Sequence, residues 1–150
     1  MIVKLMRDDR CGATLVEFTV TFPLFLLLMF GLVQAGLLLY THVGLQHGVE
    51  MAARCASVNY AANQVGLDQS CFAVAPNAVT NTTIQQYAAQ KSWGIVPASS
   101  EFTVTPPTSG GLCGTNKGYV VTVTHTYNLM NFYIFAAPLT ATSCFPVSAS

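Results

Sequence analysis

At 150 residues the chain has room for about one domain, and 52% of its residues are hydrophobic while only 8% are charged. Soluble domains carry about 25% charged residues, so this composition indicates a large core or a membrane segment. The formal net charge of zero excludes a global field that would attract nucleic acid, and no nucleic-acid partner is expected.

One uncharged stretch runs from Phe18 to Thr41. A helix of these residues would be about 36 Å long, enough to cross a hydrocarbon layer of about 30 Å. A buried helix in so small a protein would need polar side chains on one face, which Gln34 and the glycines do not supply. We therefore predict one transmembrane helix in the lipid bilayer, continuing as a membrane-proximal helix to about Ala62.

The flanking charges predict the orientation of this helix. Lys4, Arg7 and Arg10 precede the apolar stretch together with Asp8 and Asp9, whereas two histidines, then Glu50 and Arg54, follow it. Because basic residues concentrate on the cytoplasmic side, the N-terminus is predicted to be cytoplasmic and the rest of the chain extracytoplasmic. The division is then a leader at 1–12, a helix at 13–62 and an exported domain at 63–150.

The cysteines agree with an oxidising compartment. Cys11 lies in the leader, while Cys55, Cys71, Cys113 and Cys144 form an even set that predicts two disulfides, with four buried free thiols as the alternative. Four cysteines allow three pairings. Antiparallel pairing of the last two strands would bring the start of one beside the end of the other, so we predict Cys113–Cys144 and Cys55–Cys71.

A short basic leader ends in Gly12, and Glu17 is the fifth residue after it, just before the apolar stretch. This arrangement resembles the type IV prepilin processing site, which implies cleavage between Gly12 and Ala13 by a prepilin peptidase. The resemblance also implies that the Glu17 carboxylate meets the free amine of a neighbouring subunit. The alternative is that Glu17 only sits at the membrane interface and reaches headgroup water.

The wider sequence around this site is similar to the TadE-like family of pseudopilins from the tight-adherence (Flp-type) pilus machinery. The resemblance rests on residues 12–18, on Pro23 to Leu27 and on Phe30-Gly31, with looser similarity at 50–56, 118–124 and 138–142. Gln34-Ala35 departs from the family, whose members often have an acidic residue there.

The family resemblance implies a set of partners and a location. Subunit contacts would be made through Glu17, Phe18 and Pro23. The implied partners are the prepilin peptidase, other pilins or pseudopilins and the pilus assembly platform. The implied location is the bacterial inner membrane, with the C-terminal domain periplasmic or extracellular and possible incorporation in the pilus.

The exported part is predicted to be α+β. A second helix is expected from about Ala78 to Trp93, capped by Asn77 and stopped by Gly94. Alternation of apolar and polar residues then predicts a small antiparallel sheet. Its strands are expected at 101–105, 119–127 and 139–145. With the N-terminal helix, this layout is pilin-like in outline.

Two features leave alternatives open. Gly44 and Gly48, four residues apart on one helix face, could allow close helix packing or could simply weaken the helix. The apolar segment 129–135 breaks strand alternation, so it could pack under the sheet or form a partner surface.

No residue pattern indicates catalysis. His42 and His47 are about 140° apart on a helix and do not form a metal pair, and His125 is expected to be a core histidine. The glycine-rich segment 110–117 lacks the ending of a phosphate loop and is expected to be a hairpin loop. We expect no enzyme, metal, cofactor or small-molecule substrate.

These observations leave two classes of function. The favoured one is a minor pseudopilin that acts in the assembly or initiation of a Tad pilus, with a structural role. The alternative is a bitopic inner-membrane protein whose outer domain binds a ligand.

Overall fold

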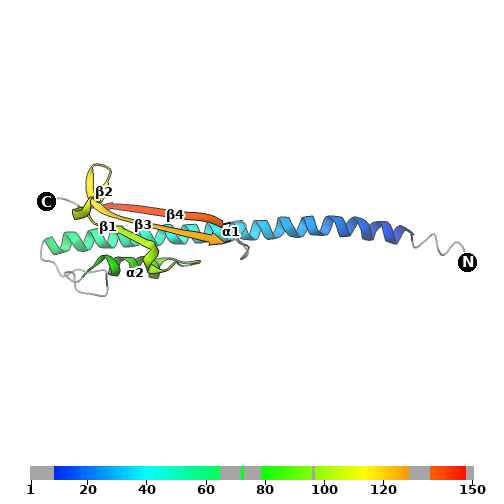
Figure 1. The fold of residues 1–150 in the computed structure, drawn as a ribbon, viewed down its shortest axis with the longest axis horizontal. Coiled ribbons are helices and arrows are strands. Elements are labelled where there is room, and N and C mark those ends of the chain that lie inside the picture. The colour runs from blue at the N-terminus through cyan, green and yellow to red at the C-terminus, as the bar shows by residue number, and fades with distance from the viewer. Residues whose placement is uncertain (1–8, 65–71, 73–78, 96, 129–135, 148–150) are drawn as a thin grey trace, which may run out of the picture. The chain divides into compact units, whose positions relative to one another are not determined.

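The structure is a computed structural model that describes residues 9–64, 72, 79–95, 97–128 and 136–147. It confirms the predicted α+β class, with a long N-terminal helix, a short second helix and a small antiparallel sheet (Figure 1). The helices are α1 (Asp9–Gln64) and α2 (Asn81–Lys91), with two 3-10 turns, η3 (Ser99–Glu101) and η4 (Pro107–Ser109). The strands are β1 (Phe102–Thr105), β2 (Leu112–Cys113), β3 (Asn116–Asn128) and β4 (Ala136–Pro146).

Helix α1 is longer than predicted at both ends. It begins at Asp9, inside the predicted leader, and ends at Gln64. No proline precedes Pro23, so the sequence contains no strong helix breaker between Asp9 and the apolar stretch. The chain divides into two compact units, 1–36 and 37–150, and the second unit includes α1 from Leu37 onward.

Strand β3 is the centre of the sheet. Strand β4 pairs with it along one edge, from Gly118 opposite Pro146 to Asn128 opposite Ala136. The other edge is shared by β1 and β2, and every pairing is antiparallel. The predicted hairpin loop at 110–117 contains β2 and its tight turn into β3.

The alternation predicted from the sequence sets the two faces of the sheet. Val121, Val123 and Tyr127 are buried, whereas Thr124 and Thr126 between them are exposed. Apolar side chains of α1 and α2 pack on the buried face, and the exposed face is rich in threonine. The core combines residues from α1, α2 and the sheet: Leu45, Val49, Ala52, Ala56, Ile84, Ala88, Phe102, Val104, Val121, Val123, Leu139 and Ala141.

Two side chains of α1 also bind the last strand through its backbone. The Ser57 hydroxyl donates a hydrogen bond of 2.8 Å to the Phe145 carbonyl, and the Gln46 amide reaches the Thr142 carbonyl at 3.4 Å. These bonds reinforce the apolar packing between the membrane-proximal half of α1 and β4, which run alongside each other in Figure 1.

Helix α2 is shorter than predicted. It starts at Asn81 with Thr80 as its N-cap, and Thr80 and Thr83 form a capping box. Thr80 satisfies the free N–H of the first turn, so the helix begins there and not near 78; the predicted cap Asn77 lies outside the described residues. At the other end the backbone becomes extended at Ser92, which ends the helix before Trp93.

Candidate functional site

The apolar part of α1 exposes its side chains. Its most apolar 18 residues include none that is buried. Among the described residues, α1 is the helix that is long and apolar enough to cross a membrane. Phe18, Leu24 and Leu27 are 61%, 70% and 72% exposed. Exposing this much contiguous apolar surface to water is unfavourable, so the helix fits a single-pass membrane protein.

Polar groups near the start of this stretch are satisfied within the helix itself. The Thr19 hydroxyl donates to the Leu15 carbonyl at 2.7 Å, and the Thr21 hydroxyl donates to the Glu17 carbonyl at 2.9 Å. In hydrocarbon these bonds replace those that water would make. Pro23, inside the helix, removes the usual donor to the Thr19 carbonyl.

The predicted processing residues all lie on α1. Ala13 and Glu17 are one helical turn apart and therefore share a side of the helix. The Gly12–Ala13 bond is helical and lies within the first turns of α1, which begins at Asp9. A peptidase that needs an extended chain would have to open only this end.

The three predicted subunit-contact residues are exposed but do not form one face. At 100° per residue, Phe18 lies about 100° from Glu17 and Pro23 about 120° away on the opposite side. Phe18 is stacked on Phe22 with a centroid distance of 5.1 Å. A neighbouring subunit would therefore reach these residues from more than one direction.

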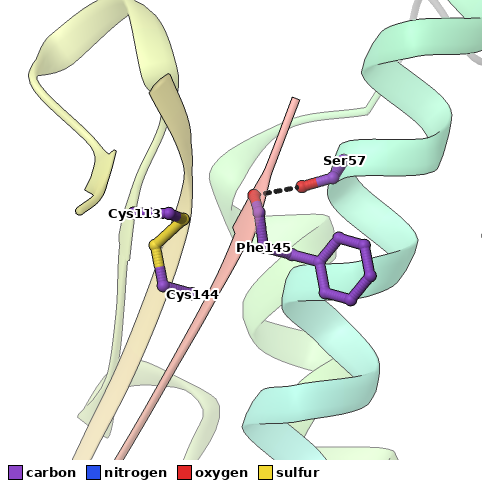
Figure 2. The surroundings of a disulfide bond; sticks show 4 residues. All are labelled: Ser57, Cys113, Cys144 and Phe145. Atoms are coloured by element: carbon purple, nitrogen blue, oxygen red, sulfur yellow. Dashed lines mark hydrogen bonds between the residues drawn. A yellow bond between two sulfur atoms is a disulfide. The ribbon is translucent and has the colours of Figure 1, made fainter. Parts of the chain in front are cut away.

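The predicted disulfide between Cys113 and Cys144 is present (Figure 2). The two Cα atoms are 5.5 Å apart, and the bond joins the strands that flank β3. Cys55 is also disulfide-bonded. Its predicted partner Cys71 lies outside the described residues, so the Cys55–Cys71 pair stays a prediction.

The histidines do not gather into a reactive site. The His125 ring contacts the Glu101 carboxylate, with Nδ1 and Oε2 2.8 Å apart, and Glu101 also accepts a hydrogen bond from the Ala98 N–H. This pair fixes η3 against β3. His47 lies against the Trp93 ring and donates a hydrogen bond to the Lys91 carbonyl. The described residues contain no group of three metal-ligating side chains.

Gly44 and Gly48 lie against the end of α2 and the residues that follow it. A Cβ on Gly44 would overlap the Trp93 carbonyl oxygen, and a Cβ on Gly48 would overlap the Ser92 hydroxyl. The two glycines therefore permit close packing, with the end of α2 and the following loop as the partner. Sequence reasoning did not find Ser92 and Trp93 as this partner, because the glycine spacing shows only that one side of the helix is open.

Together these features define a protein with a long apolar helix, which carries a glycine–glutamate motif near its start, and a small disulfide-bonded α+β domain. Residues 12–54 match the family model described as TadE-like protein, in agreement with the resemblance predicted from this segment. The match spans the motif, the apolar stretch and the membrane-proximal helix up to Arg54. The TadE-like family is a structural, pilus-associated family, so the match suggests an involvement in the Tad pilus. Neither the curated proteins nor the solved structures gave a significant match to the chain.

Proposed function

We propose that this protein is a minor pseudopilin that acts in the assembly or initiation of a Tad pilus. Its N-terminus is cytoplasmic, its α+β domain lies in the periplasm or outside the cell, and a prepilin peptidase cuts it between Gly12 and Ala13. It binds other pilins or pseudopilins and the assembly platform through α1. Its role is structural and not catalytic.

The observation that carries this proposal is the position of Glu17 on α1. Glu17 lies one turn after Ala13 and directly before the apolar stretch of α1, whose side chains are exposed. A carboxylate in a bilayer requires a charge partner or protonation. The amine released at Ala13 by cleavage would be such a partner, on the same helix or on a neighbouring one.

The test is the N-terminal residue of the full chain, extracted from the membranes of cells with an active prepilin peptidase. Mass spectrometry is expected to find Ala13, and Gly12→Val is expected to leave the chain uncut, because a β-branched side chain obstructs the extended peptide in the cleft. Gly36→Val places the same change in open space on α1 and should be cut normally. Intact Met1 in the unmutated protein would contradict the proposal.

A further inference from the structure

The loop after α2 runs along α1 toward the apolar stretch. Residues 92–94 contact α1 in reverse order, with Ser92 at Gly48, Trp93 at Gly44 and Gly94 at Thr41. A Cβ on Gly94 would lie only 2.9 Å from the Thr41 hydroxyl. The loop therefore runs about two helical turns along α1 toward the N-terminus of that helix, and Ile95 follows at the end nearest the apolar stretch.

The contact points on α1 lie at the edge of the predicted membrane span. Thr41 is the last residue of the predicted membrane span, directly before His42, and Gly44 lies about 4.5 Å farther along the helix axis. The polar headgroup layer extends about 5–8 Å beyond the hydrocarbon on each side of a bilayer. Trp93 is thus held at the level of the headgroups when α1 crosses the membrane.

Three of the side chains at this level are apolar or aromatic and exposed. Tyr40, Val43 and Ile95 have exposed fractions of 55%, 57% and 49%. Trp93 is partly covered by the His47 ring, whose centroid is 4.6 Å from its own. Tryptophan and tyrosine favour the membrane interface, where one end of the ring meets apolar chains and the other meets water.

The charges around these side chains suit phospholipid headgroups. Residues 41–49 and 92–98 contain no formally charged side chain, so no carboxylate would repel lipid phosphates. The nearest charged residue on α2 is Lys91, which is exposed at the end of the helix. Its ammonium group lies over the Tyr87 ring, 5.4 Å from the ring centroid, and adds no negative charge near this surface.

We propose that Tyr40, Val43, Trp93 and Ile95 form a membrane-docking surface, which lies in the headgroup layer of the bilayer that α1 crosses. The occupant of this surface is phospholipid. The contact fixes the α+β domain against the bilayer while the protein is held in the membrane. It depends on the insertion of α1 and not on the pilus role, so the two proposals can fail separately.

Trp93 provides the measurement, because it is the only tryptophan in the chain. The full chain is placed, one copy per disc, in phospholipid nanodiscs whose lipids carry bromine near the acyl carbonyls or near the chain ends. We expect a blue-shifted Trp93 emission that is lost most strongly with the shallow bromines and is protected from aqueous iodide. Trp93 emission that is quenched by neither brominated lipid but is quenched by iodide would overturn the proposal. So would emission protected from iodide but insensitive to bromine.

Variants then test the surface itself. Ile95→Asp should reduce the quenching by shallow bromines and increase quenching by iodide, because a carboxylate is repelled from the phosphate layer. The matched control is Leu112→Asp, an exposed leucine on β2 with a 58% exposed side chain, which should behave like the unmutated protein. Thermal melting checks that both variants fold, with Ile95→Ser as a milder replacement if needed. Equal quenching in the folded Ile95 variants and the unmutated protein would overturn the proposal.

Discussion

Cys113 and Cys144 are joined by a disulfide that passes over Gly118 of the central strand. A Cβ on Gly118 would overlap the Cys113 sulfur, so the bond requires a glycine at this place. Cys144 and Phe145 are neighbours on β4 and point to opposite faces of the sheet. Cys144 therefore bonds Cys113 on one face, while the Phe145 side chain packs against the core on the other and its backbone carbonyl accepts the Ser57 hydrogen bond (Figure 2).

Removing this disulfide should lower the stability of the domain markedly. The bond joins residues separated by 31 positions. In the chain-entropy model such a loop contributes about 3–4 kcal/mol to the free energy of unfolding. We expect Cys113→Ser with Cys144→Ser to lose stability of that order in thermal or denaturant unfolding of the solubilised chain. Cys11→Ser, in the predicted leader, is the control and should melt like the unmutated protein; an equal loss in both would contradict the assignment.

Gly48→Ala should destabilise the packing of α2 on α1. The new methyl group would overlap the Ser92 hydroxyl and approach the Ala88 carbonyl oxygen to 2.7 Å. Because one obstacle is backbone, the expected loss is about 1–3 kcal/mol, larger than the gain in helix propensity. Gly36→Ala on the same helix meets nothing within 4 Å and should be neutral or slightly stabilising. Unfolding curves compare the two, and equal stabilities would refute the close contact.

The stability of the domain should fall at alkaline pH through Tyr119. Burial of its phenol raises the pKa above the ordinary value of about 10, and the nearby Tyr60 raises it further. Above that ordinary value the unfolded chain releases the proton while the folded chain keeps it, so the free energy of unfolding decreases as pH rises. The free energy of unfolding of Tyr119→Phe should decrease less steeply with pH above about pH 10. Below that pH it should differ from that of the unmutated protein by a constant amount. An offset that stays constant at all pH values would show that Tyr119 does not contribute.

Glu17→Ala should weaken pilus assembly without affecting folding or membrane insertion. The side chain is exposed on α1, so its loss removes no described packing. Pilus yield is expected to fall several-fold while the amount of membrane-inserted, disulfide-bonded protein stays unchanged. Glu50→Ala, an exposed glutamate farther along the same helix, is the control. Normal piliation by the Glu17 variant would leave the residue with an interfacial role only.

The sequence identified the elements whose signals are local. An uncharged stretch longer than a bilayer is thick predicts a membrane helix wherever it is placed, and alternating residues from Tyr119 to Tyr127 predict a half-buried strand. The Cys113–Cys144 pair also followed from the sequence, because antiparallel strands bring the start of one beside the end of the other. The limits of α2 do not follow from local sequence, since both Asn77 and Thr80 are able to cap a helix and tertiary packing selects between possible starts.

Tertiary structure alone decided what faces the membrane-proximal half of α1. The spacing of Gly44 and Gly48 indicates an open side of the helix, yet it is equally compatible with packing and with local weakness. Only the folded chain brings Trp93 over Gly44, because that contact depends on the length and direction of α2 and on the capped end at Ser92. A local pattern indicates which side of a helix or strand is apolar. The residues that pack against that side come from distant parts of the chain, so a short stretch of sequence does not identify them.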